Sequence, residues 1–165
     1  MDLKELSALW APWRVEYYKH GGTADFLLQA ANATDDAAHL VVARKKSTFL
    51  IMNRFPYAVG HLMAVPYQKV AEISQLSTEA KLELWDLAEL AQNILRQTVK
   101  AQGFNVGLNL GKCAGAGVAD HLHLHIVPRW EGDHNFMPVL SETHILPEAL
   151  ESLYSRMIEA AAALT

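Results

Sequence analysis

The chain lacks the features that would suit it to an oxidising, membrane or nucleic-acid setting. It has one cysteine in 165 residues, so it can form no internal disulfide, and a reducing cytoplasm is expected. It contains no long apolar run of the kind found in signal peptides or membrane-spanning helices. Its net charge of −4 argues against a nucleic-acid binder with a basic surface. The remaining composition, 51% hydrophobic and 19% charged, predicts one globular domain over residues 1–165.

The most informative stretch is 121–127, where His121, His123 and His125 alternate with apolar residues. A period of two is typical of a half-buried β-strand, so the pattern predicts three imidazoles on one face and an apolar core face. Packing explains the apolar face but does not explain a row of imidazoles. Surface histidines remain the simplest alternative, although three in strict alternation make it a poor one.

Two kinds of chemistry fit these histidines. Histidines two apart on a strand can reach one zinc ion, so a metal-dependent hydrolase stays open. Alternatively, a neutral imidazole can attack phosphorus while its neighbours bind the phosphate oxygens and move protons. Residues 111–118 contain three glycines, whose N–H groups can approach a phosphate closely. This segment directly precedes the histidines, which favours phosphate over metal.

The stretch 121–127 resembles the defining motif of the histidine-triad nucleotide hydrolases and transferases. Residues 53–61, which place His61 eight positions after Asn53, are similar to the family's upstream motif. Residues 9–14 and 128–133 resemble a bacterial branch that includes diadenosine tetraphosphate phosphorylases and related hydrolases.

The resemblance implies an α+β fold, in which helices cover a mainly antiparallel sheet of about five strands. It also implies an enzyme that cleaves the α-phosphate linkage of adenosine nucleotides, with diadenosine polyphosphates as the expected substrates. Such enzymes need no cofactor and assemble as homodimers or larger homo-oligomers. No nucleic acid or membrane is expected as a partner. The alternatives are a nucleotide sensor or scaffold with little catalysis, and a hydrolase of other adenylylated compounds.

The family pattern also assigns roles to the histidines. His123 is the expected nucleophile, which becomes nucleotidylated before water or inorganic phosphate releases the nucleotide. His125 and His61 are expected to bind the phosphate and to assist proton movement. His121 is expected to order the group.

A second set of residues is expected to bind the nucleotide. The resemblance assigns Asn53 to the ribose hydroxyls and Asn109 to the transferred phosphate. It assigns Ile51 and Met63 to the wall of the base pocket, although without the resemblance plain packing in the core would be the preferred explanation for both. Many relatives carry a hydroxyl where this chain has Val118, so the expected contacts there are the backbone N–H groups of Gly117 and Val118.

The chain departs from its relatives at a structural zinc site. Many relatives have two cysteines near residues 25–28 and a histidine at the position of Lys69. Without thiolates the site loses its strongest zinc ligands, so we predict no bound metal.

The remaining patterns outline the secondary structure. An aromatic arm is expected at 1–20 and a solvated basic turn at 44–47. Asp133 and His134 are expected to be surface residues, and the alternative is contact with a second nucleotide or phosphate. Strands are expected at 40–43, 48–53, 61–65 and 105–110, and helices from Ser77 to just before Gly103 and from Pro147 through 165.

Overall fold

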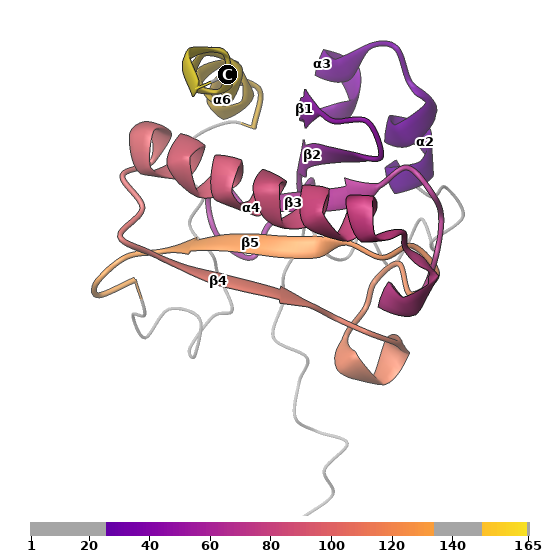
Figure 1. Ribbon diagram of the computed structural model, residues 1–165. Helices are drawn as coiled ribbons and strands as arrows, with labels where there is room; N and C mark the ends of the chain where they lie inside the picture. Colours follow the sequence, from indigo (N-terminus) through magenta and orange to yellow (C-terminus); the bar gives the residue numbers. More distant parts are fainter. Residues whose placement is uncertain (1–25, 134–149, 165) are drawn as a thin grey trace, which may run out of the picture.

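A five-stranded sheet forms the centre of the computed structural model, which describes residues 26–133 and 150–164 (Figure 1). All neighbouring strands are antiparallel, in the order β1-β2-β3-β5-β4. The strands are β1 Val41–Arg44, β2 Thr48–Met52, β3 Leu62–Pro66, β4 Gly103–Leu108 and β5 Leu124–Arg129. The helices are α2 Phe26–Asn32, α3 Asp36–His39, α4 Thr78–Thr98 and α6 Leu150–Leu164, with short 3₁₀ turns η2 Ile73–Gln75 and η3 Lys112–Ala114. The predicted α+β fold is confirmed.

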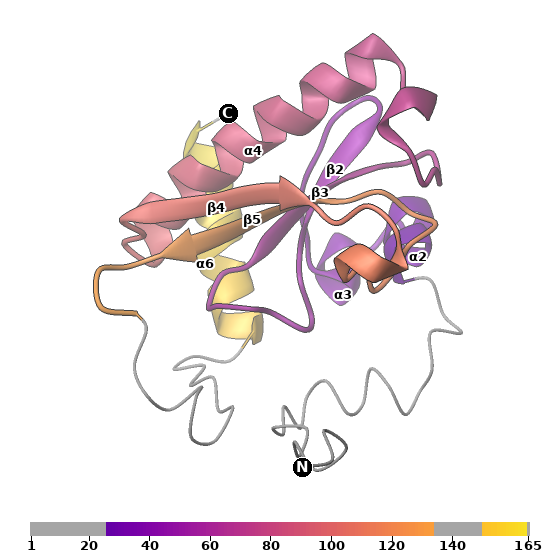
Figure 2. The ribbon, with the colours of Figure 1, turned by 90° about the horizontal axis from the view of Figure 1, so that it is seen from below.

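Alternation along β2 divides the buried side chains between two cores, one on each face of the sheet. Leu50 and Met52 belong to the larger core, which includes the buried residues of α4 and α6. Phe49 and Ile51 belong to a smaller core closed by α2. Figures 1 and 2 show α4 and α6 together on one side of the sheet. The face toward α2 is therefore the one near which a ligand site can form.

Helix α4 begins as predicted and ends earlier than predicted. The Ser77 side chain accepts a hydrogen bond from the Ala80 N–H, which caps the first turn. The helix ends at Thr98, so the prediction that Gly103 marks its end is wrong. Lys100 takes the left-handed conformation (φ 55°) that usually falls to glycine, and Ala101 N–H then bonds back to the Leu95 carbonyl. Gly103 is thereby left to begin β4.

Strand β5 starts later than the histidine pattern predicts. It runs from Leu124 through Arg129, so only His125 of the three histidines lies inside it. The apolar partners still face the larger core, as predicted from the alternation. The three histidines are buried, none being more than 7% exposed. Burial of three imidazoles requires partners for their nitrogens.

The loop between β2 and β3 is held in one conformation by its backbone. Asn53 N–H donates to the His61 carbonyl, which closes the loop at its base. Gly60 has φ +79°, and a Cβ there would lie 2.7 Å from Leu95 Cδ2 of α4. A glycine at this position therefore lets α4 pack against the residue just before His61.

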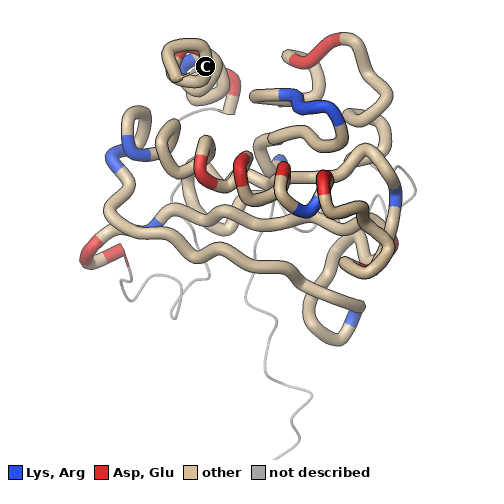
Figure 3. Tube along the Cα trace, in the orientation of Figure 1, with Lys and Arg blue, Asp and Glu red and all other residues tan. Residues whose placement is uncertain are grey.

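Lys45 and Lys46 of the predicted basic turn at 44–47 are exposed and pair with α4, whereas Arg44 is half-buried at the end of β1 and does not belong to a solvated turn. Lys45 pairs with Asp86 at 2.7 Å and Lys46 pairs with Glu79 at 3.0 Å. Figure 3 shows the blue turn beside the red positions along α4. Because the four side chains are largely exposed, each pair adds little to stability.

The last helix starts at Leu150, and Pro147 lies outside the described residues, as does the aromatic arm at 1–20. The predicted face of α6 is confirmed, because Leu153 and Met157 are fully buried against the larger core. Tyr154 extends over the edge of the sheet and donates its hydroxyl to the Val41 carbonyl at 2.8 Å.

Candidate active site

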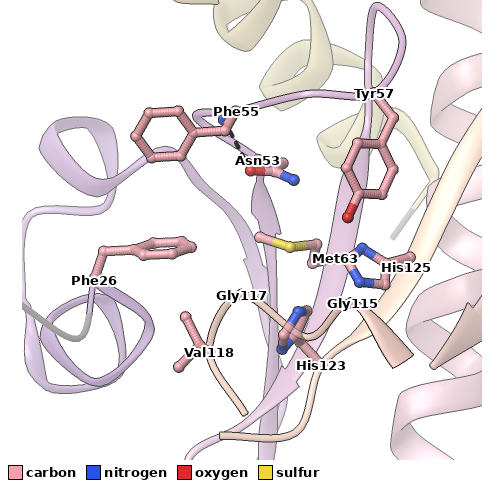
Figure 4. Close-up of a pocket in the computed structure, with 10 residues that line it drawn as sticks. All are labelled: Phe26, Asn53, Phe55, Tyr57, Met63, Gly115, Gly117, Val118, His123 and His125. Atoms are coloured by element: carbon pink, nitrogen blue, oxygen red, sulfur yellow. Dashed lines mark hydrogen bonds between the residues drawn. The ribbon is translucent and has the colours of Figure 1, made fainter. Parts of the chain in front are cut away.

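One cavity gathers most of the residues singled out in the sequence (Figure 4). It opens between the β2–β3 loop, α2 and the glycine-rich segment before β5. The open space within it is about 570 Å³, part of which is continuous with the solvent. The lining residues are Phe26, Asn53, Phe55, Tyr57, Met63, Gly115, Gly117, Val118, His123 and His125.

The backbone sets the tautomer of His123. Its Nδ1 lies 2.8 Å from the carbonyl oxygen of His121. A carbonyl oxygen only accepts, so Nδ1 carries the proton and donates it. In the neutral ring, Nε2 then holds the lone pair. His123 lines the cavity, so this lone pair belongs to a side chain that a ligand there would touch.

A chain of hydrogen bonds sets the tautomers of His61 and His125. His61 Nδ1 faces two donors, the Tyr57 backbone N–H and the Asn53 Nδ2, each at 3.2 Å, so it must accept. Asn53 is held in this orientation because its Oδ1 accepts from the Phe55 N–H at 2.9 Å. In the neutral ring His61 Nε2 therefore carries the proton and donates to His125 Nδ1, 2.9 Å away.

His125 consequently presents an N–H group to the cavity. Its Nδ1 is an acceptor, so the proton of the neutral ring sits on Nε2. This nitrogen is buried and has no hydrogen-bond partner among residues 26–133 and 150–164. The ring centroids of His123 and His125 are 4.7 Å apart, with the rings edge to face. A nucleophilic lone pair and a hydrogen-bond donor thus stand side by side.

Burial keeps His61 and His125, which we call the histidine pair, neutral. It lowers the pKa of His125 from 6.5 to about 4, with further lowering by the charge on His123. Burial also holds the pKa of His61 well below its usual range, and charge on His125 and His123 acts in the same direction. Near neutral pH both rings therefore keep the tautomers described above.

The lowered pKa of His125 predicts a loss of stability in acid. The unfolded chain takes up a proton near pH 6.5, whereas the folded chain takes it up near pH 4. The contribution is thus fully present above pH 6.5 and is lost as the pH falls to 4, and its size is about 3 kcal/mol. Urea unfolding at a series of pH values should show this slope, and His125→Gln should reduce it. A wild-type slope that the substitution does not change would contradict the assignment.

The segment before β5 is fastened to the end of β3. His121 Nε2 donates to the Pro66 carbonyl at 2.9 Å, and Leu122 N–H donates to the Val70 carbonyl at 2.7 Å. Lys69, the residue at the expected zinc-ligand position, pairs with Asp120 at 2.7 Å. His121 is fully buried and does not line the cavity. His121 contacts the site through its backbone carbonyl, which accepts the hydrogen bond that orients His123.

The glycine-rich segment forms the floor of the cavity opposite the β2–β3 loop. Gly111 and Gly115 take left-handed conformations that allow the tight turn around η3. Gly117 and Val118 line the cavity, and their N–H groups make no hydrogen bond within the described residues. These donors are therefore available to an anion.

The cavity includes six of the predicted residues and leaves out four. Met63 and its cross-strand partner Ile51 are both buried in the smaller core, and of the two only Met63 also lines the cavity. Asn109 follows the end of β4, half-buried, and is not among the lining residues. The other two, His61 and His121, act on the cavity through His125 and His123.

The sequence patterns did not single out three lining residues, Phe26, Phe55 and Tyr57, whereas Gly115 belongs to the glycine-rich segment 111–118. These three are aromatic side chains with no periodic signal. Phe26 is the first residue of α2, and Phe55 and Tyr57 lie in the β2–β3 loop. Only Tyr57 and Phe55 had a usable signal, their place inside the 53–61 motif.

Two other sequence predictions concern metals and surface residues. Within the described parts of the chain, no group of three or more His, Cys, Asp or Glu side chains is placed to hold a metal ion. Asp133 accepts two hydrogen bonds from Arg129 and one from the Trp130 N–H, so it closes a turn at the far end of β5. His134 lies outside the described residues. No described helix is both long and apolar enough to span a membrane.

Comparisons with known proteins show the family of the chain. The HIT-domain family matches residues 34–132. An AP-4-A phosphorylase from Mycobacterium tuberculosis is 36% identical over 155 residues, covering 88% of this chain and 80% of that protein. A bis(5'-adenosyl)-triphosphatase from Dictyostelium discoideum is 29% identical over 86 residues, covering 52% of this chain and 57% of that protein.

The solved structures give the same result. The crystal structure of a hypothetical histidine triad nucleotide-binding protein from Sulfolobus tokodaii superposes with a TM-score of 0.62 at 26% identity. The match covers 76% of this chain and 85% of that one. The protein therefore belongs to the HIT family, the histidine-triad proteins.

Proposed function

We propose that the protein cleaves the α-phosphate linkage of adenosine nucleotides, with diadenosine polyphosphates as substrates, through a covalent nucleotidyl-histidine. The observation that carries the proposal is the pairing in one cavity of a lone pair on His123 Nε2 with a donor on His125 Nε2. The two related enzymes, an AP-4-A phosphorylase and a bis(5'-adenosyl)-triphosphatase, support this class of substrate.

The nucleoside fits the apolar end of the cavity. Phe26 of α2 and Phe55 of the β2–β3 loop lie at one end with Val118, and Met63 lies between them and the histidines (Figure 4). Aromatic and thioether side chains suit the faces of a purine. Asn53 has one amide hydrogen and one lone pair beyond its bonds to His61 and Phe55, and these suit ribose hydroxyls.

The phosphate chemistry then follows from the tautomers. His123 Nε2 attacks the α-phosphorus, the new N–P bond forms, and the P–O bond to the leaving phosphate chain breaks. The His125 N–H and the N–H groups of Gly117 and Val118 hold the phosphoryl oxygens. Water or inorganic phosphate next attacks the same phosphorus and displaces His123. His61 keeps the donor of His125 aimed at the phosphate, and His121 keeps His123 in its attacking tautomer.

The neutral state of the histidine pair favours a polyphosphate as the leaving group. A polyphosphate departs as a weakly basic anion and needs a hydrogen-bond donor more than a proton. An amine leaving group must be protonated, and a pair with lowered pKa values holds no spare proton at neutral pH. Diadenosine polyphosphates therefore suit the site better than adenylylated amines.

Turnover of diadenosine tetraphosphate by protein purified with chelator tests the proposal. The products are separated by mass, with and without inorganic phosphate. ADP plus ATP formed only with phosphate identifies a phosphorylase, and AMP plus ATP formed without it identifies a hydrolase. Activity that is lost on chelation and restored by a metal ion, or the absence of any product from protein that binds AMP, would refute the mechanism.

We also propose a homodimer or larger homo-oligomer in a reducing cytoplasm. Two features support the assembly: β4 lies at one edge of the sheet, and α4 carries the exposed side chains Leu82 and Trp85. The exposed thiol of Cys113 supports the compartment. Neither nucleic acid nor a membrane is among the proposed partners. Light scattering behind size-exclusion chromatography measures the mass, and a monomer at micromolar concentration would contradict the assembly.

A further inference from the structure

Tyr57 lies where the histidine pair meets the opening of the cavity. It belongs to the β2–β3 loop, and its ring centroid is 4.7 Å from that of His61 and 5.6 Å from that of His125. Its backbone N–H is one of the two donors to His61 Nδ1. The residue lines the cavity, yet it is 37% exposed, unlike the buried histidines beneath it.

The side chain points into the cavity from the end opposite the apolar one. In Figure 4 the hydroxyl of Tyr57 is directed toward His125 and Met63, while Phe26 and Phe55 lie on the other side of Met63. If the nucleoside fills the apolar end, its α-phosphate reaches His123 near the middle. Atoms beyond the α-phosphate then lie toward Tyr57 and the solvent.

A phenol hydroxyl at that place has a definite chemical use. It can donate one hydrogen bond to an anionic phosphate oxygen, and a donor to a charged group binds more strongly than a neutral pair. Gly117 and Val118 lie on the opposite side of the cavity from Tyr57 (Figure 4), so donors of that segment do not duplicate this one.

We propose that Tyr57 is the residue that contacts the leaving phosphate chain, so that it selects substrates with a phosphate beyond the α-position. This inference rests on the proposed function, because it takes the α-phosphate to lie at His123. Tyr57 touches substrate through its hydroxyl and has no covalent role. Its ring and backbone hold the histidine pair in place whatever the ligand.

Tyr57→Phe removes the hydroxyl and keeps the ring and the backbone, so it measures the contribution of the hydroxyl alone. Calorimetry with AMP and with the non-hydrolysable α,β-methylene analogue of ADP compares ligands that differ in the second phosphate. The variant should bind the ADP analogue about tenfold more weakly, because one hydrogen bond to a charged oxygen is lost. The affinity for AMP should change by less than about twofold, and kcat/KM for diadenosine tetraphosphate should fall about tenfold.

Tyr67→Phe is the matched control, because it removes the same hydroxyl from a tyrosine outside the cavity. Tyr67 contacts Arg44 at 3.3 Å and stacks on Phe49 in the smaller core. This variant should keep the wild-type ratio of the two affinities. Thermal unfolding of both variants shows whether either substitution disturbs the fold.

Each outcome decides the inference. A loss confined to the ADP analogue supports it. An equal loss for both ligands would place the hydroxyl at the AMP moiety, and no loss for either would leave the hydroxyl outside the ligand contacts; both overturn it. Wild-type protein that binds neither ligand refutes the proposed function and this inference with it, whereas binding by the wild type without discrimination by Tyr57→Phe refutes the inference alone.

Discussion

Replacing His123 with alanine should lower the turnover of diadenosine tetraphosphate by at least about 10⁴-fold, because it removes the attacking atom itself. No other imidazole nitrogen of the site has a lone pair that is not already engaged in a hydrogen bond. His125 presents an N–H, and the His61 nitrogens are occupied by Asn53, Tyr57 and His125. A residual rate is expected from the phosphate-binding donors alone.

The same variant tests the covalent intermediate. Wild-type protein mixed with substrate and quenched in denaturant should carry one adenylyl group by mass spectrometry, and peptide mapping should place it on His123. His123→Ala should carry none, and it should bind AMP within a few-fold of the wild type because the base and ribose contacts remain. Near-normal turnover, or an adduct on a different residue, would remove His123 as the nucleophile.

Replacing His125 with leucine should have the next largest effect. It removes the N–H group that faces the cavity and leaves His61 Nε2–H without its acceptor. Loss of one donor to the charge that develops in a transition state costs roughly 10²–10³-fold in rate. We therefore expect kcat for diadenosine tetraphosphate to fall by that factor while the affinity for AMP changes far less.

His125→Gln distinguishes a donor from a proton source. A glutamine can place an amide N–H near the position of the imidazole Nε2–H but cannot give up a proton. If the group acts as a donor, the glutamine variant should recover most of the rate lost in the leucine variant. Equal loss in both variants would mean that His125 must transfer a proton, contrary to the neutral pair described above. A leucine variant with the wild-type rate would exclude either role.

Local patterns were sufficient for the larger part of the fold. Apolar runs bounded by the basic turn and by Pro66 placed β2 and β3, the alternation of 121–127 placed the core face of β5, and the Ser77 cap and apolar stripe placed the start of α4. Such signals are reliable because each side chain's exposure follows from the strand or helix period alone. The end of α4 was mispredicted because Lys100 adopts a conformation for which glycine is the usual signal.

The candidate site could be predicted from the sequence only where the chain contains a motif of a known family. The three histidines and the 53–61 motif indicated three of the cavity's residues, His123, His125 and Asn53, and the family resemblance added Met63, Gly117 and Val118. Ile51 and Met63 face each other across β2 and β3, and sequence spacing treats them alike. In the folded chain both are buried in the smaller core with α2, and only Met63 also lies at the cavity wall.

The sequence by itself determined the family, the sheet and the choice of His123 as the proposed nucleophile, because these depend on residue types at short spacings. The tertiary structure alone decided the protonation geometry. His61 and His125 are 64 residues apart, yet their direct hydrogen bond gives His125 the N–H that faces the cavity. Which nitrogen of a histidine carries the proton depends on its neighbours in space, and no local pattern records which distant residue that neighbour will be.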